Sequence, residues 1–230
     1  MPAHEAVPKF ETFGDLLDSL GGISPKRVRM KPLPGKATAK DVIRIRDTER
    51  RLFELVDGTL VEKVMGAPES SVAALLIQLL RNYSDEQGQL GVVFGEAGTL
   101  KLLGKLVRIP DVSFTYRSRL PNGKVPRDQV PDLAPDLAVE VLSRQNTRRE
   151  MERKLKEYFL AGVRLVWFVD PRPRTVRVFT SPDDVTGIGP EGTLDGGDVL
   201  PGFRVPVARL FAELEDVPAP SRKPSKRKQK

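Results

Sequence analysis

The sequence predicts an α/β protein built on a mixed β-sheet. Two neighbouring β-prone runs are joined by Asp57 and Gly58, a dipeptide typical of a two-residue hairpin turn. Farther along the chain, two apolar runs at residues 137–142 and 164–169 are separated by a helical segment, and this order predicts a parallel crossover. We therefore expect antiparallel hairpins and a βαβ unit in one sheet, with helices packed over it.

The N-terminal elements follow from capping signals and composition. Thr12 precedes an amphipathic stretch at residues 13–20 that ends at two glycines, which predicts a short helix. Residues 24–35 are basic and rich in proline, so we expect an extended segment there. These elements form a predicted extension over residues 1–37.

The main domain is expected to begin at Thr38 and to end at residue 216. Thr38 and Asp41 have the spacing of a capping box and predict a helix to about residue 48. The hairpin strands are predicted at residues 51–56 and 59–64, on either side of the turn.

The rest of the domain is predicted as strands and helices in alternation. Apolar residues at helical spacing indicate a long helix over residues 69–83, which should lie on one face of the sheet. The next four runs predict a meander, at residues 92–94, 99–103, 105–109 and 112–116. After a polar loop at 117–135, the predicted elements are strand 137–142, helix 147–161, strand 164–169, strand 175–180 and helix 207–214.

Composition excludes several classes of function. The chain has 230 residues and no cysteine, so a disulfide framework, a thiol nucleophile and a thiolate metal site are absent. The one histidine, His4, lies near the terminus, which nearly excludes histidine-based catalysis. No run approaches the roughly 18 apolar residues of a membrane span, and residues 1–10 lack the pattern of an export signal. We expect a cytoplasmic protein with no membrane partner.

The net charge of +7 depends on the C-terminal segment at residues 217–230. Its six basic residues, with no acidic ones, account for six of the seven net positive charges. The segment is rich in proline, serine and lysine and is expected to be a disordered tail. Such a tail is either a solubilising end or an arm that binds phosphates without specificity.

Three acidic residues lie on or beside predicted strands: Glu54, Asp111 and Glu140. A carboxylate on a buried strand loses hydration unless a cation or a hydrogen bond replaces it, so several together suggest a shared divalent metal. Asp111 follows Pro110, which cannot donate to a sheet and marks an edge, a strand start or a bulge. Two structural alternatives stay open: Glu54 on the outer face of the hairpin, and Glu140 in an ion pair with a nearby basic residue.

Lys154 is the lysine best placed to join these acids. On a helical projection it lies nearer to the apolar face of the helix at 147–161 than Arg153 or Lys156 does. In a metal-dependent nuclease such a cation orients the attacking water or stabilises developing negative charge. The alternative is an interfacial lysine whose stem covers apolar surface while its ammonium group reaches solvent.

An ordered set of motifs resembles the Uma-two family of restriction endonucleases, within the PD-(D/E)XK nuclease superfamily. The matching positions are residues 53–58, 109–112, 134–143, 154, 158, 162–163 and 167–171. The resemblance covers residues from about 41 to 211 and implies a restriction-endonuclease-like core with Mg²⁺-dependent cleavage of DNA phosphodiesters, Mn²⁺ being a substitute. It assigns Asp111 and Glu140 as metal ligands, Glu54 as an accessory acid and Lys154 as the active-site lysine.

One position departs from the superfamily pattern. Leu142 stands two residues after Glu140, where that pattern has its lysine. The resemblance implies that this lysine is carried on the following helix instead, and Lys154 fits that displacement. Three hypotheses follow: a DNA endonuclease, a catalytically inactive DNA-binding or interaction module, and a structural domain whose acids pair with arginines. For the endonuclease, a homodimer with two active sites would be the simplest arrangement for double-strand cleavage.

Overall fold

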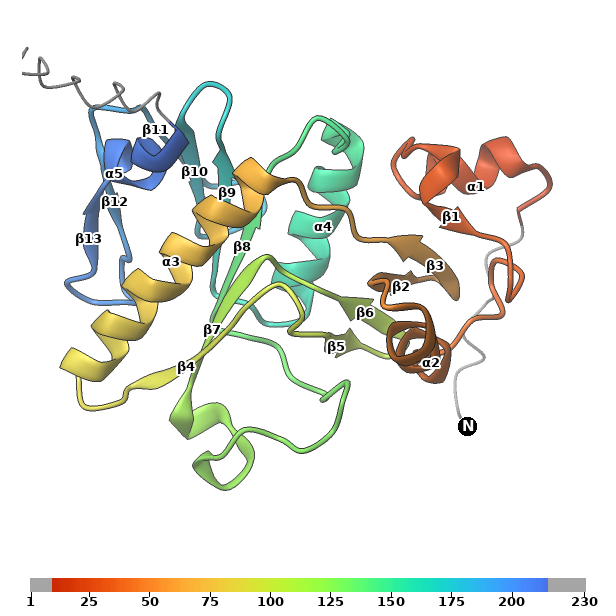
Figure 1. Ribbon diagram of the computed structural model, residues 1–230, viewed down its shortest axis with the longest axis horizontal. Coiled ribbons are helices and arrows are strands. Elements are labelled where there is room, and N and C mark those ends of the chain that lie inside the picture. Colours follow the sequence, from red (N-terminus) through yellow and green to blue (C-terminus); the bar gives the residue numbers. More distant parts are fainter. Residues whose placement is uncertain (1–9, 215–230) are drawn as a thin grey trace, which may run out of the picture.

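A computed structural model describes residues 10–214 of the chain. The predicted tail at 217–230 and His4 lie outside the described residues, and the domain boundaries at 38 and 216 stay predictions. The α/β class is confirmed: helices pack on two sheets, of six and five strands, and a two-stranded ribbon lies beside them (Figure 1). Within residues 10–214, none of the helices combines the length and the apolar character needed to cross a membrane.

The larger sheet has the strand order β11-β10-β9-β8-β7-β4. Its strands are β4 (Gly91–Phe94), β7 (Val112–Tyr116), β8 (Leu137–Val141), β9 (Leu165–Asp170), β10 (Thr175–Phe179) and β11 (Val185–Ile188). The pair β8–β9 is parallel and the other pairs are antiparallel. The predicted parallel crossover is therefore confirmed, since the helix between β8 and β9 connects parallel neighbours.

Helices cover both faces of the larger sheet. On one face lie α3 (Ala67–Glu86) and α5 (Val207–Phe211), followed by the 3₁₀ turn Ala212–Leu214. Their apolar side chains pack with Val139 and Trp167 of the sheet. On the other face, α4 (Arg148–Leu160) packs on Ala138 and Phe168. Alternate residues of β8 therefore face opposite helices.

The smaller sheet has the order β1-β3-β2-β6-β5. Its strands are β1 (Val28–Arg29), β2 (Phe53–Val56), β3 (Thr59–Glu62), β5 (Leu100–Leu103) and β6 (Leu106–Arg108). The predicted hairpin forms β2 and β3, but it lies in this smaller sheet and not in the sheet of the βαβ unit, where we expected it. The helix α2 (Ala39–Glu49) begins with the predicted capping box and packs on Phe53, Leu55 and Leu60.

The predicted meander over residues 92–116 is wrong. The four strands exist, but β4 pairs with β7 in the larger sheet, while β5 and β6 pair with each other and β6 pairs with β2 in the smaller one. Pro110 lies between β6 and β7, and its missing N–H group ends the pairing of one sheet before the other begins. The chain thus crosses between the two sheets at residues 109–111.

The N-terminal extension packs against the smaller sheet and α4. The helix α1 (Phe13–Ser19) is capped at its N-terminus by Thr12, as predicted, and buries Leu16. Residues 24–35 are not wholly extended, because Pro25–Arg27 forms a 3₁₀ turn before β1 joins β3. The buried Arg27 guanidinium donates two hydrogen bonds to Glu150 of α4, at 3.1 and 2.8 Å.

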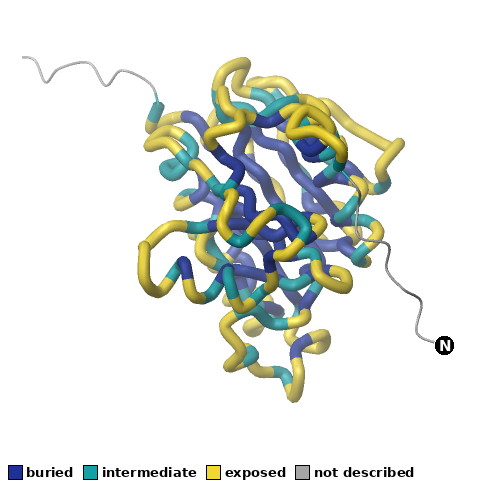
Figure 2. Tube along the Cα trace, turned by 90° about the vertical axis from the view of Figure 1, so that its right-hand side faces the viewer, coloured by how far each residue is buried: buried dark blue, intermediate teal, exposed yellow. Residues whose placement is uncertain are grey.

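The sequence predicted the connections between the main strands and helices least well. The predicted polar loop at 117–135 contains the 3₁₀ turns Arg117–Arg119 and Pro121–Gly123. The segment between the predicted strand 175–180 and α5, for which no element was predicted, contains β11 and the ribbon of β12 (Thr193–Asp195) and β13 (Arg204–Pro206). Figure 2 shows buried segments of the chain at the centre of the molecule, with exposed segments around them.

Gly58 is required by the hairpin turn. Its φ is +69°, and a Cβ atom there would lie 2.6 Å from the carbonyl carbon of Gly35. We expect Gly58→Ala to lower the free energy of unfolding by about 3 kcal/mol, because it adds backbone strain to a steric overlap. Urea denaturation measures the change. Gly88→Ala is the matched control, since Gly88 has a φ of +73° with no atom near its Cβ position, and should cost only about 1 kcal/mol. Equal losses would contradict the close approach to Gly35.

Candidate active site

The four residues singled out in the sequence lie in one buried cluster. Glu54 comes from β2, Asp111 from the crossing between the sheets, Glu140 from β8 and Lys154 from α4. None of the four is more than 3% exposed. The cluster lies where the smaller sheet meets the α4 face of the larger sheet.

Glu54 is held by two hydrogen-bond donors and by an ion pair. Its Oε2 atom accepts a hydrogen bond from Arg108 Nη1 at 2.7 Å, and its Oε1 atom accepts one from the backbone N–H of Ile109 at 3.2 Å. Lys154 Nζ lies 3.1 Å from Oε1. Glu54 is therefore not on a solvent-exposed face of the hairpin.

The side chain of Asp111 takes the place of a backbone partner for β8. Its Oδ2 atom accepts a hydrogen bond from the backbone N–H of Val141 at 2.6 Å, and its own N–H donates to Val139 at 3.0 Å. These two bonds fix Asp111 beside the end of β8. The other oxygen, Oδ1, is left to face Lys63 at 2.8 Å.

Glu140 points toward α4 and accepts from three side chains. Tyr158 Oη donates to Oε1 at 2.5 Å, and Lys154 Nζ lies 3.1 and 3.2 Å from the two carboxylate oxygens. Lys63 Nζ donates to Oε2 at 3.1 Å. The ion-pair alternative for Glu140 thus describes its contacts correctly, and both of its charged partners are lysines.

Lys154 is buried along its whole length. Its side chain is 1% exposed, and the ammonium group lies between Glu54 and Glu140. An interfacial lysine that reaches solvent would place this group outside the protein. The geometry instead gives Lys154 two carboxylate partners in the interior.

Lys63, Arg108 and Tyr158 were not singled out as site residues, and all three contact the cluster. The hairpin register could have pointed to Lys63. Glu54 pairs with Val61, and Lys63 lies two residues farther along the chain, so its side chain is on the same face of the sheet as Glu54. No comparable local signal marks Arg108, whose guanidinium also donates to Glu157. Tyr158 is one of the positions that match the family resemblance, but no role was predicted for it.

Neighbouring cations set the charge states of the two glutamates. Burial alone would raise the pKa of Glu54, but Lys154 and Arg108 outweigh it and hold this pKa below its ordinary value. Burial likewise opposes the charge on Glu140, yet Lys154 and Lys63 lower the pKa of that carboxyl. Both glutamates are therefore ionised at neutral pH.

Asp111 and Lys63 differ in how well their charges are compensated. Burial is the largest influence on Asp111 and, with the nearby Glu140 charge, raises the pKa of Asp111 above its ordinary value despite Lys63. For Lys63, burial opposes the ammonium form, but Asp111 and Glu140 outweigh it and raise the pKa of Lys63. Asp111 is thus the carboxylate that would gain most from further positive charge.

The donor set is compatible with a hard divalent cation. Asp111 and Glu140 both direct an oxygen atom at Lys63 Nζ, so the two carboxylates already share one positive group. Among the described residues, Asp111 Oδ1 accepts no hydrogen bond of normal geometry. Within residues 10–214 no set of three acidic, histidine or cysteine side chains is arranged to hold a metal. Mg²⁺ is commonly held by one or two carboxylates, with water and substrate phosphates completing its shell.

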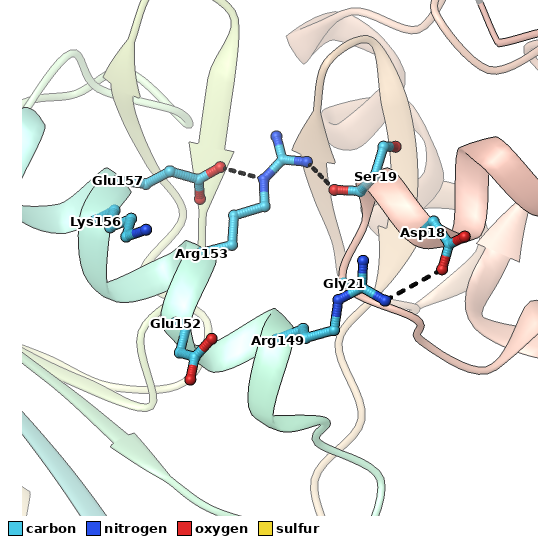
Figure 3. Close-up of a pocket in the computed structure, with 8 residues that line it drawn as sticks. All are labelled: Asp18, Ser19, Gly21, Arg149, Glu152, Arg153, Lys156 and Glu157. Atoms are coloured by element: carbon cyan, nitrogen blue, oxygen red, sulfur yellow. Dashed lines mark hydrogen bonds and ion pairs between the residues drawn. The ribbon is translucent and has the colours of Figure 1, made fainter.

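A separate pocket lies between α1 and α4, outside the cluster (Figure 3). Arg153 donates to the backbone oxygen of Ser19 at 2.6 Å and to Glu157 at 2.7 Å, and Arg149 donates to Asp18 at 3.2 Å. These arginines therefore hold α1 against α4.

Comparisons with known proteins agree on a family and a fold. The model of the Uma2 family, described as "Putative restriction endonuclease", matches residues 39–208. One similar solved structure is described as a "putative nuclease belonging to DUF820" from Anabaena variabilis, with a TM-score of 0.66 and 20% sequence identity. The match covers 77% of this chain and 99% of that chain. No curated protein matches the sequence.

Proposed function

The chain belongs to the Uma2 family, and on this premise we propose that it is a Mg²⁺-dependent DNA endonuclease that hydrolyses phosphodiester bonds. The observation that carries the proposal is the convergence of Asp111 and Glu140 on a single cation, beside a second buried ammonium group. Mn²⁺ is expected to substitute for Mg²⁺, since both suit carboxylate oxygens.

Asp111 and Glu140 are the proposed metal ligands. A bound divalent cation would polarise the phosphate and stabilise the negative charge that develops on it. Glu54 does not contact the cation shared by these two acids, and its proposed role is to hold Lys154 together with Arg108.

Lys154 is proposed to orient the attacking water. Its ammonium group is fixed by Glu54 and Glu140, so it keeps one position without reorganising during the reaction. Water supplies the oxygen that attacks phosphorus while one ester P–O bond breaks. The reaction therefore needs no nucleophile from the protein, which agrees with a chain that lacks cysteine.

Purified protein is expected to nick supercoiled plasmid DNA when Mg²⁺ or Mn²⁺ is present and to stop when EDTA removes the metal. Asp111→Asn should lower the nicking rate by about 100-fold or more, because it removes a ligand charge from the metal. Gel separation of supercoiled and nicked plasmid measures the rate.

The matched control is Asp85→Asn, which removes an exposed aspartate from the end of α3. This variant should nick at the wild-type rate. Nicking by Asp111→Asn at that same rate would contradict the assignment of Asp111 as a metal ligand, and nicking that persists in EDTA would contradict the metal dependence.

A second candidate function is a DNA-binding or interaction module without the chemistry. The contact of Lys63 with both proposed ligands favours it, since a protein ammonium group can neutralise them without a metal. Such a module would bind DNA with an affinity that falls steeply with salt, would lose binding when residues 217–230 are deleted, and would not cleave in any divalent ion. DNA is the partner in both proposals, and a homodimer would supply the second active site for double-strand cleavage.

A further inference from the structure

Lys63 and Lys154 each contact two of the three carboxylates of the cluster, and both contact Glu140. Lys154 lies between Glu54 and Glu140. Lys63 lies between Asp111 and Glu140, with its Nζ atom 2.8 and 3.1 Å from their oxygens. The proposed metal ligands therefore already hold a cation that belongs to the chain itself.

The charges of the cluster are balanced while Lys63 is in this position. Glu54, Asp111 and Glu140 face Arg108, Lys63 and Lys154. Glu157, the second partner of Arg108, is also paired with Arg153, so the set holds four charges of each sign. A divalent cation added to this set would leave two uncompensated positive charges in the protein interior, which is energetically unfavourable. If Lys63 leaves, one positive charge remains, and a phosphodiester carries the single negative charge that neutralises it.

Lys63 is the cation of the cluster that can leave most easily. Its side chain is 8% exposed, compared with 1% for Lys154, and the next residue, Val64, is exposed. The backbone stays in place, because the N–H of Lys63 donates to Leu52 at 2.9 Å. An unbranched lysine stem can therefore carry the ammonium group to solvent while the sheet stays intact.

We propose that Lys63 is an internal counter-ion that occupies the cation position between Asp111 and Glu140 and swings outward when a divalent cation takes its place. The inference rests on the proposed metal site and adds a competitor for it within the same chain. Lys63 then lowers the affinity of the site for metal and keeps the carboxylates neutralised when metal is scarce.

Isothermal titration of the full-length protein with Mn²⁺ tests this competition. Lys63→Met should bind Mn²⁺ at least ten-fold more tightly than the wild type, because methionine removes the charge and keeps the length of the stem. Lys63→Arg keeps the charge and should not bind more tightly than the wild type. The matched control is Lys101→Met, since Lys101 also lies 2.8 Å from an aspartate, Asp132, but in an exposed pair, and should bind Mn²⁺ like the wild type.

Thermal unfolding supplies a second measurement that does not depend on a calorimetric signal. Without metal, Lys63→Met should unfold at a lower temperature than the wild type, because two buried carboxylates are left close together. Added Mn²⁺ should raise the unfolding temperature more in this variant than in the wild type.

Two results would overturn the inference in different ways. Equal Mn²⁺ affinity in the wild type and Lys63→Met, at a site that Glu140→Gln abolishes, would remove the competition and leave the metal site standing. No Mn²⁺ binding in any of these proteins would overturn the metal site itself, and the inference with it.

Discussion

Glu140→Gln is expected to lower the rate of plasmid nicking by about 1,000-fold or more, which corresponds to about 4 kcal/mol of lost transition-state stabilisation. Glutamine keeps the size of the side chain and an oxygen that can accept from Tyr158 and Lys154. It removes the negative charge that a divalent cation needs from its ligand. Glu140 should show the largest loss of activity, because it contacts both Lys63 and Lys154.

Two measurements distinguish this loss from unfolding. Circular dichroism should show a folded variant, and titration with Mn²⁺ should show that binding is lost with the activity. Glu86→Gln, a change of the same kind at the exposed end of α3, should leave both unchanged. A folded Glu140→Gln protein that keeps wild-type nicking would contradict the proposed role of Glu140.

Lys154→Met should give the largest loss of stability, about 3–5 kcal/mol in the free energy of unfolding. Its ammonium group compensates two buried carboxylates, those of Glu54 and Glu140, and methionine would leave both short of positive charge. Urea denaturation at pH 7 measures the loss.

The same helix provides the control for this prediction. Lys156 is exposed on α4, and Lys156→Met should change the free energy of unfolding by less than about 0.5 kcal/mol. Combining Lys154→Met with Glu54→Gln should cost less than the sum of the two single changes, because the glutamine removes one of the two carboxylates that methionine leaves short of positive charge. Strict additivity would mean that Lys154 and Glu54 do not interact.

Local signals were sufficient for most elements of the fold. Capping at Thr12 and Thr38 and the turn at Gly58 each depend on residues a few positions apart, and the structure has the corresponding elements. The partition of strands between two sheets depends on contacts between distant segments. Nothing in residues 92–116 specifies that β6 pairs with β2 rather than with the strand that follows it.

The candidate site shows the same division between local and distant information. Sequence patterns pointed to Glu54, Asp111, Glu140 and Lys154, which the structure brings into one cluster, while their roles stay predictions. The cations that complete the cluster were harder to predict from the sequence. Arg108 meets Glu157 and Glu54 only because the end of β6 lies within reach of both α4 and β2. A lysine after a hairpin strand, such as Lys63, is ordinary in sequence.

The position of the cluster between the two sheets has a consequence for the order of folding. Lys63 and Glu140 are separated by 77 residues, and Lys154 lies on the helix after Glu140. During synthesis the hairpin that carries Glu54 and Lys63 leaves the ribosome well before these partners exist. Its charged face stays in water until α4 docks on both sheets. Closure of the ion network therefore requires segments that lie far apart in the chain, and the proposed active site exists only in a chain whose two sheets are already joined.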